Sequence, residues 1–555
     1  MLEGFVRYPE SFVKKYKEKG YWIDKTLGEE FDEWVNRHPH RVALAYMGNY
    51  VSYAEMAKKV NRLSLHLINL GLRPYDRIIL QLPNELEFAY CYFAAVKIGV
   101  IPILALPAHR DAEISFFAQF TRARAHLIPS RFRDFSHQAM SREIRKKIPT
   151  LELTLVSGEA VAVEDDFVSI TILLRDRIEE RVSVESLKKY RPDPMEPAVF
   201  QLSGGTTGVP KIIPRTHNDY SLNCKRVTEI TKVREDSVMG IAIPINHNFA
   251  LSSPGLMGML YKGGKVVLIP STKTEAIFES IQKEKITIMP TPPALLLRWM
   301  EAPELSKYDL SSLEVVLAGG ARLNAEAAKK IKSTLGCDFH QNLGMAEGML
   351  FWTERDDPED LLLNTQGTPM FEDDEIRVVD ENDQEVPYGE SGELLVRGPT
   401  TIRGYYHSPE YNKKAFTEDG FYRTGDVVRI VQGRYLAVEG RIKDTINRGG
   451  EKISAEEVEN HILAHPKVEN CAYVAMPDPV LGEKGCAFIL TKGNQALTLD
   501  ELWQFLKEER HISIFKLPER LELVKEFPMT QVGKIDKKEL RSIIKEKLAK
   551  EPKIK

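Results

Sequence analysis

Cysteine is scarce in this chain of 555 residues, which holds five scattered cysteines and no CxxC pair. The odd count and the wide spacing argue against a disulfide framework and against a structural zinc site. We interpret each cysteine as a small buried apolar residue, and we expect the protein to work in a reducing cytoplasm.

An excess of one charge sign is also missing. The sequence has 76 basic and 80 acidic residues, a formal net charge of −4. This balance gives no reason to expect nucleic acid or an anionic membrane as a partner. Residues 1–20 carry charges throughout and have no apolar central segment, so we expect no secretory signal.

No long apolar run is free of interruptions. The most apolar stretch, residues 90–108, contains a lysine, Gly99 and two prolines, which are costly in a lone membrane-spanning helix. We predict instead a buried helix over about 85–97, a turn at Gly99 and then a buried strand. Asn84 and Glu87 have the spacing of a capping box for this helix.

Short apolar runs alternate with amphipathic segments over residues 1–430, which predicts α/β layers with largely parallel sheets. Near residue 375 the pattern changes to strands joined by turn residues, which indicates an antiparallel or barrel-like subdomain. We predict a large domain of layered α/β subdomains with this small subdomain over 1–440. A small mobile α+β domain follows over 441–555.

A Walker phosphate loop is absent, because the stretch "LSGGTTGVPKIIPRTHNDY" (202–220) does not place its lysine directly after the last glycine. The dinucleotide pattern G-x-G-x-x-G fails as well. The stretch still has glycines that let the backbone approach an anion, hydroxyl donors and one cation, directly after an apolar strand. It is either a phosphate cradle or a solvated turn. The candidate phosphate-binding residues are Ser203, Gly204, Gly205, Thr206, Thr207, Gly208 and Lys211.

Four further motifs follow along the chain. "LGMAEG" places Glu347 in a glycine-flanked turn, and "FYRTGDVVRI" places Asp426 after a Thr-Gly turn. "GRIKD" contains Arg441, and "TQVGKIDKKEL" places Lys534 just before a predicted helix. Each residue has an ordinary alternative as a turn residue or a surface charge.

Taken together and in this order, the motifs resemble those of the adenylate-forming enzymes over nearly the whole chain. That family includes acyl-CoA synthetases, luciferases and the adenylation domains of peptide synthetases. Within it, "RTHNDY", "NHNFALSSPG" and the N-terminal "YPESFVKKYKEKGYW" are similar to the stand-alone aryl-acid AMP ligases of siderophore pathways.

The resemblance implies two half-reactions with ATP and Mg²⁺. A carboxylate first attacks the α-phosphorus of ATP to give acyl-AMP and pyrophosphate, and a thiol then expels AMP. The loop 203–211 would hold the β- and γ-phosphates, and Glu347 would help hold Mg²⁺. Asp426 would bind the ribose hydroxyls, with Arg441 near the ribose and phosphate. Lys534 would bridge the α-phosphate and the acid.

The resemblance also assigns an adenine slot and a hinge. Ala346 stands where the family often has a hydroxyl residue. The small domain would rotate about Lys443 between the half-reactions, and Gly449 and Gly450 would line the entry of the pantetheine arm. The adenine slot would be formed by Gly319, Gly320, Ala321, Asn342, Gly344, Met345 and Ala346.

The acid site is expected in "NHNFALSSPG". Ser253 leans toward 2,3-dihydroxybenzoate, whereas Phe249 and Leu350 suit salicylate, and 3-hydroxyanthranilate is a further alternative. Asn342 would contact either a ring substituent or nearby backbone. We favour 2,3-dihydroxybenzoate, with salicylate next. The acid-binding set is His247, Asn248, Phe249, Ser253, Ala321, Asn342 and Leu350, and His247 is also a catalytic candidate.

The acceptor thiol would belong to a separate aryl carrier protein, and we expect a monomer or a homodimer. An aryl-CoA ligase is the first alternative. An inactive nucleotide-binding scaffold is the second, and the intact Lys211, Glu347, Asp426 and Lys534 argue against it. A P-loop phosphotransferase is disfavoured by the failed Walker spacing.

Overall fold

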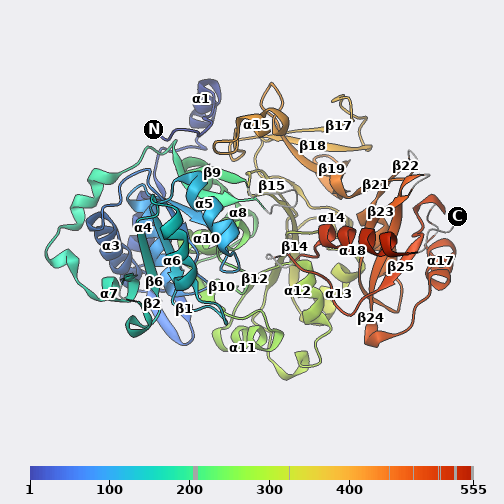
Figure 1. Cartoon of the computed structure of the whole chain (residues 1–555), viewed down its shortest axis with the longest axis horizontal. Helices are drawn as coiled ribbons and strands as arrows, with labels where there is room; N and C mark the ends of the chain where they lie inside the picture. The colour runs from blue at the N-terminus through green and yellow to red at the C-terminus, as the bar shows by residue number, and fades with distance from the viewer. Residues whose placement is uncertain are drawn as a thin grey trace.

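The computed structural model describes residues 1–555 except 165, 204–210, 324, 449–450, 479–480, 511, 513, 531–533 and 552–555. Figure 1 shows the N-terminal and central elements on the left and in the middle, and the red C-terminal elements on the right. Within the described part, no helix combines the length and the apolar character needed to cross a bilayer.

The first large sheet has nine strands, of which the six central ones are parallel. The edge strands β2, β15 and β16 run antiparallel to their neighbours. In spatial order the sheet is β16 (Thr368–Pro369), β15 (Leu350–Trp352), β14 (Asp338–Gly344), β13 (Val315–Ala318), β12 (Ile288–Thr291), β10 (Val238–Ile241), β11 (Lys265–Leu268), β1 (Val42–Tyr46) and β2 (Asn49–Ser52).

The second large sheet has seven strands and is parallel except for its last pair, β8 and β9. Its order is β7 (Val168–Ser169), β6 (Leu153–Ser157), β5 (Ala125–Pro129), β3 (Arg77–Leu80), β4 (Ile101–Leu104), β8 (Pro197–Leu202) and β9 (Ile212–Thr216).

A layer of helices lies between these two sheets and forms the main core with both of them. Further helices cover the outer face of each sheet. The inner layer holds α2 (Leu27–Arg37), α3 (Tyr53–Asn69), α4 (Leu86–Lys97), α8 (His217–Ile230), α9 (Asn248–Ser252) and α10 (Gly255–Lys262). The outer helices are α5 (Asp111–Thr121) and α6 (His137–Lys147) on the seven-stranded sheet, and α11 (Thr274–Glu284), α12 (Pro293–Met300) and α13 (Ala325–Leu335) on the nine-stranded one.

A four-stranded sheet follows, drawn in yellow and orange in Figure 1. All its pairings are antiparallel, which is the first of the two forms that the sequence indicated. Its strands are β17 (Glu375–Val379), β18 (Ser391–Arg397), β19 (Tyr422–Gln432) and β20 (Tyr435–Arg441). The other helices of this part are α1 (Glu10–Glu18), α7 (Ile170–Arg175), which joins the main core, α14 (Glu359–Asn364), which packs with the outer helices of the nine-stranded sheet, and α15 (Pro409–Ala415).

The C-terminal part is a five-stranded sheet with helices on both faces. Its strands are β21 (Thr445–Arg448), β22 (Glu451–Ser454), β23 (Val468–Asp478), β24 (Gly482–Thr491) and β25 (Arg520–Leu523). Helices α16 (Ala455–Leu463) and α17 (Leu499–Glu508) pack on one face and α18 (Lys537–Lys550) on the other. The α/β fold with a large N-terminal and a small α+β C-terminal domain is therefore confirmed, whereas the border at 440/441 stays a prediction.

Two further expectations have a structural outcome. All five cysteines are free and buried, which confirms their interpretation as core residues. The capping box of Asn84 and Glu87 was wrong. Glu85 is the N-cap of α4, and the Asn84 amide instead donates to the carbonyl oxygens of Ile241, Ile243 and Ile269 in the other large sheet.

Candidate active site

The predicted adenine slot lies where the parallel strands β13 and β14 end side by side. Gly319 follows β13, and a Cβ atom on it would lie 2.6 Å from Nδ2 of Asn342 on β14, so a larger residue would have to displace the Asn342 side chain. Gly320 has φ +90°, which also favours glycine. The carboxyl ends of parallel strands are the usual place for a ligand in α/β sheets.

Asn342 makes the backbone contact that the sequence left as one of its two alternatives. Its side-chain nitrogen donates to the carbonyl oxygen of Ala318 at 3.2 Å, and the residue is buried. Leu350, also buried, lies on the neighbouring strand beside Gly344. The pair β14–β15 therefore brings the predicted residues Asn342, Gly344 and Leu350 together.

Glu347 follows β14 and is held by a buried pair of phenols. The Tyr405 hydroxyl donates to a carboxylate oxygen of Glu347 at 2.6 Å, and the Tyr422 hydroxyl lies 2.9 Å from that of Tyr405. Burial raises the pKa of both tyrosines well above the usual value, so they remain neutral donors. The next residue, Gly348, packs against Thr400 too closely for any Cβ atom.

Asp426 and Arg441 face each other across strands β19 and β20 and form an ion pair of 2.7 Å. The Asp426 carboxylate is buried, and burial raises its pKa against the opposing effect of Arg441. Glu347 and Lys534 also act on the charge of Asp426, which places the three groups in one neighbourhood.

Lys534 comes from the C-terminal domain and reaches the strand-end edge of the large one. A Cβ atom on Gly320 would lie 3.4 Å from Cε and 3.7 Å from Nζ of Lys534. Lys534 keeps contact with solvent, yet desolvation by the surrounding protein and then the charge of Arg441 lower its pKa to about 8. Two hydrogen bonds join the backbone of Lys534 to Thr530 and close the loop that carries it.

His247 and the following residues form the other end of the site. Burial first, and the charge of Lys534 second, lower the pKa of His247 to about 4, so its ring is neutral near pH 7. The Phe249 backbone N–H donates to Nδ1 of His247 at 3.3 Å. In the neutral ring the proton is therefore on Nε2, which becomes a donor.

Asn248 and Ser253 lie side by side, with Nδ2 of Asn248 3.5 Å from Oγ of Ser253. Both residues and Phe249 are buried. Because Lys534 lowers the pKa of His247 and its side chain approaches Gly320, it links this group to the predicted adenine slot. We call the region of His247, Asn248, Phe249 and Ser253, where the sequence predicts binding of the acid, the acid slot.

Ser203 and Lys211, at the two ends of the predicted phosphate loop, are joined by hydrogen bonds. The Ser203 backbone N–H donates to the Lys211 carbonyl at 3.0 Å, and the Lys211 N–H donates to Oγ of Ser203 at 2.9 Å. The Lys211 ammonium lies 4.0 Å from the ring centre of Tyr411. Gly204, Gly205, Thr206, Thr207 and Gly208 lie outside the described residues.

Comparison with known proteins decides the family. The model of the AMP-binding enzyme family matches residues 31–406, and that of the AMP-binding enzyme C-terminal domain matches residues 457–534. The chain belongs to the AMP-binding enzymes. It is therefore an adenylate-forming ligase, and the resemblance derived from the motifs is confirmed.

Similar members of this family cover almost the whole chain. A 2,3-dihydroxybenzoate-AMP ligase of Bacillus subtilis is 44% identical over 99% of both chains. A salicylyl-CoA synthase / salicylate adenylyltransferase of a Streptomyces species is 42% identical over 98% of both chains. The apo structure of MbtA from Mycobacterium smegmatis is 38% identical, covers 97% of this chain and 98% of its own, and has a TM-score of 0.73.

Several residues of this adenylate-forming ligase were not singled out from the sequence. Buried Arg215 forms an ion pair of 2.6 Å with buried Asp219 and donates to the Ala346 carbonyl at 2.9 Å, next to Glu347. Their i, i+4 spacing in "RTHNDY" was a visible signal. Tyr405 and Tyr422 had none beyond their aromatic character.

The remaining predictions concern the hinge and the loop after it. Lys443 lies in the 3₁₀ turn Ile442–Asp444 between β20 and β21, and Arg541 on α18 contacts Asp444 at 2.9 Å. Ala321 is exposed beside Gly320, and Met345 and Ala346 are half-buried between Gly344 and Glu347. Gly449 and Gly450 lie outside the described residues.

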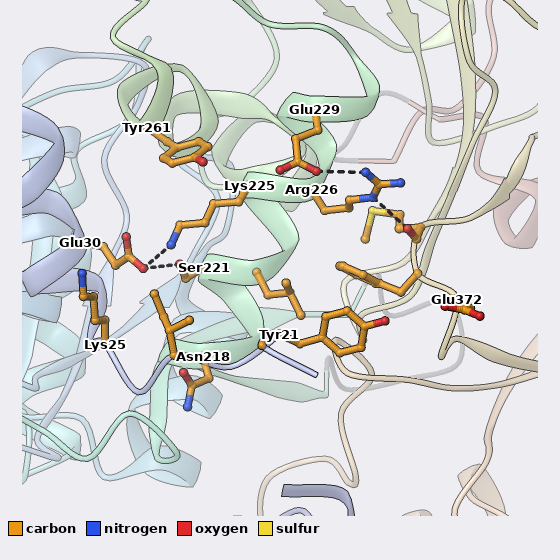
Figure 2. Close-up of a pocket in the computed structure, with 15 residues that line it drawn as sticks. Tyr21, Lys25, Glu30, Asn218, Ser221, Lys225, Arg226, Glu229, Tyr261 and Glu372 are labelled. Atoms are coloured by element: carbon orange, nitrogen blue, oxygen red, sulfur yellow. Dashed lines mark hydrogen bonds and ion pairs between the residues drawn. The ribbon is translucent and has the colours of Figure 1, made fainter. Parts of the chain in front are cut away.

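A separate pocket of about 400 Å³ lies on the other side of α8, away from the predicted site residues. Figure 2 shows its lining, with Lys225 and Ser221 of α8 both meeting Glu30 of α2, and Arg226 meeting Glu229. Three lining cations, Lys25, Lys225 and Arg226, already pair with carboxylates.

Proposed function

We propose that this ligase activates an aromatic acid with ATP and passes the acyl group to a thiol. The first step forms a bond from a carboxylate oxygen to the α-phosphorus and breaks its bond to pyrophosphate. In the second, the thiolate attacks the acyl carbon, the bond to AMP breaks, and the thiol proton passes to solvent. The approach of the Lys534 side chain to Gly320, together with its effect on the pKa values of His247 and Asp426, carries the proposal.

Each charged or polar residue of the site would have its own part in the first step. Lys534 would stand between the acid and the nucleotide, where negative charge would gather as the carboxylate meets the α-phosphate. Nε2–H of His247 would donate to the acid carboxylate and orient it. Asp426, with Arg441 beside it, would hold the ribose, and Ser203 to Lys211 would hold the β- and γ-phosphates without activating the γ-phosphate.

Mg²⁺ fits the carboxylate of Glu347. Tyr405 occupies one carboxylate oxygen and fixes its direction, which leaves the other oxygen for a hard cation. Bound there, Mg²⁺ would neutralise charge on the phosphates. Few protein ligands are needed, because this ion keeps waters and uses substrate phosphates.

We place the domain border at 440/441 and the hinge at Lys443. Thiol attack requires room where Lys534 stands, so the C-terminal domain would rotate between the two steps. Gly449 and Gly450 would then border the path of the thiol. We expect the cytoplasm as the location and a monomer or a homodimer as the assembly.

The favoured acid is 2,3-dihydroxybenzoate, with salicylate next. Ser253 lies beside Asn248, so two polar groups can meet adjacent ring substituents. The relative that is 44% identical is named for 2,3-dihydroxybenzoate, which supports this order. The acceptor would be the phosphopantetheine thiol of a separate aryl carrier protein in siderophore-type biosynthesis.

Acid-dependent exchange of pyrophosphate into ATP tests the activity. We expect exchange with 2,3-dihydroxybenzoate and salicylate and much less with unsubstituted benzoate. Complete absence of exchange with every substituted benzoate, in folded protein with Mg²⁺, would refute the proposal.

An aryl-CoA ligase is the second candidate, because a relative at 42% identity is named as a salicylyl-CoA synthase. The two candidates share the first half-reaction and differ in the acceptor. Thioester formation with coenzyme A and with a purified aryl carrier protein, measured on the same enzyme, separates them.

A further inference from the structure

The side-chain oxygen of Asn248 receives two buried hydrogen bonds. The Tyr220 hydroxyl on α8 donates to Oδ1 of Asn248 at 2.9 Å, and the Ser252 hydroxyl, one turn further along α9, donates to it at 3.1 Å. Tyr220 and Ser252 are fully buried. Both lone-pair directions of this amide oxygen are thus occupied by the protein.

A backbone carbonyl fixes the direction of one of these bonds. Nδ2 of Asn223 lies 3.0 Å from the Ser252 carbonyl oxygen, which can only accept, so the Asn223 amide cannot be turned around. The same nitrogen lies 3.3 Å from the Ser252 hydroxyl oxygen. The hydroxyl therefore accepts from Asn223 and directs its single proton to Asn248.

A second series of hydrogen bonds reaches Asn248 from strand β8. Nε2 of Gln201 donates to the Tyr220 hydroxyl at 2.8 Å, which leaves the phenol proton for Asn248. Burial raises the pKa of Tyr220 to about 12, so the phenol keeps that proton at neutral pH. Both series of hydrogen bonds require the same orientation of the Asn248 amide, with its oxygen toward α8 and its nitrogen toward Ser253.

The polar end of the acid slot consequently offers donors. Both Nδ2 of Asn248, at 3.5 Å, and Nδ2 of Asn223, at 3.4 Å, approach Oγ of Ser253. That oxygen is thereby used as an acceptor, and its own proton points elsewhere. Asn248 keeps a second N–H, because one amide nitrogen carries two.

We propose that Tyr220 and Ser252, held by Gln201 and Asn223, are positioning residues that lock the Asn248 amide nitrogen toward the ring. The slot then selects an acid with a hydrogen-bond acceptor next to its carboxylate and rejects one with a donor. This inference rests on the proposed aromatic-acid activation.

The chemistry of the two substrate classes matches this selection. In 2-hydroxybenzoates the ortho hydroxyl donates an intramolecular hydrogen bond to the carboxylate. A lone pair of its oxygen then points outward and can accept a hydrogen bond. In 2-aminobenzoates one N–H likewise donates to the carboxylate, but the second N–H points outward at the Asn248 donor. The N–H of the acid and the N–H of Asn248 would then both lack an acceptor. Unpaired buried polar groups are costly, so 2-aminobenzoates should be strongly disfavoured.

The test uses Tyr220→Phe, Ser252→Ala and the double variant, with Lys225→Met as the matched control. Lys225 lies on the same helix but faces the pocket of Figure 2. For each protein, kcat/KM for pyrophosphate exchange is measured with 2-hydroxybenzoate, 2-aminobenzoate and benzoate. Ratios within one preparation are independent of its folded fraction.

We expect the 2-hydroxybenzoate to 2-aminobenzoate ratio to fall about threefold in each single variant and about tenfold or more in the double variant. The control keeps the wild-type ratio. In all variants, kcat/KM with benzoate changes by less than about threefold. An unchanged ratio in the double variant, or an equal loss for all three acids, would overturn the inference. A wild-type enzyme inactive with every substituted benzoate would instead refute the proposed function, and this inference with it.

Discussion

At the acid end of the site, Asn248 is 7% and Ser253 3% exposed, and both are bonded to buried neighbours. At the phosphate end, the Arg441 side chain is 47% exposed, and Lys534 keeps solvent contact and comes from the other domain. Buried, mutually bonded groups resist reorientation, whereas exposed charges on a separate domain can leave. Under the proposed function, selection of the acid is therefore built into the core of the large domain, while the catalytic charge comes from the C-terminal domain.

Among the variants that test this comparison, Lys534→Ala is expected to have the largest effect. We expect pyrophosphate exchange to fall about 10³-fold, because a preorganised charge at the reacting phosphate is lost. Transfer of preformed acyl-AMP to the thiol remains close to the wild-type rate. The exposed Lys538→Ala serves as the control, and an equal loss in both half-reactions would contradict the delivered-charge account.

The buried side of the comparison is tested by Arg215→Met. Asp219 would stay buried without its cation, which costs about 3–5 kcal/mol of the free energy of unfolding. Chemical denaturation measures this loss. Arg177→Met, which removes an exposed ion pair with Glu180, should leave the unfolding midpoint near that of the wild type. A similar midpoint for Arg215→Met and the wild type would show that the core pair is dispensable.

Asp426→Asn tests the nucleotide end of the site, where the buried Asp426 carboxylate pairs with the partly exposed Arg441 side chain. Removing the charge paired with Arg441 should raise the KM for ATP about 10–100-fold and leave the order of acid preference unchanged. Asp383→Asn, at the exposed ion pair with Arg423, is the control. A changed acid preference would show that the two ends are not separable.

The lowered pKa of Lys534 gives a pH dependence. Only the protonated amine carries the charge, so kcat/KM for exchange should decline as pH rises through about 8, roughly tenfold per unit above it. In Lys534→Arg this alkaline decline should disappear below pH 10, since guanidinium stays charged. Persistence of the decline in that variant would assign it to another group.

The smallest change is expected for Asn342→Val. Its amide is already used by the Ala318 carbonyl, so substitution should alter kcat/KM for 2,3-dihydroxybenzoate and salicylate by the same factor, below about tenfold. A change in their ratio would show that Asn342 contacts a ring substituent.

The sequence was informative where a residue acts through local backbone or charge. Asp426 was predicted from its place after a Thr-Gly turn, Lys534 from its place just before a helix, and Gly320 from the family resemblance, and the structure brings them together. Their roles remain predictions. The alternation of apolar runs likewise predicted α/β layers with largely parallel sheets, because strand and helix periods differ along the chain.

Long-range hydrogen bonds were beyond sequence reasoning. Asn84 has the spacing of a local cap, yet carbonyl groups more than 150 residues away take its amide. The orientation of Asn248 likewise depends on Gln201, Tyr220 and Asn223, which no spacing rule links. A side chain with several available partners is settled by tertiary packing, not by local preference.

The central claim is that Lys534 meets the acid carboxylate while the ring lies against the adjacent side chains of Asn248 and Ser253. A crystal structure with 2-hydroxybenzoate, Mg²⁺ and an ATP analogue that cannot release pyrophosphate tests it most directly. The account predicts Nζ of Lys534 at about 2.7–3.2 Å from a carboxylate or α-phosphate oxygen, with Nδ2 of Asn248 toward the 2-oxygen. A ring bound elsewhere, or a Lys534 far from both oxygens in that complex, would contradict it.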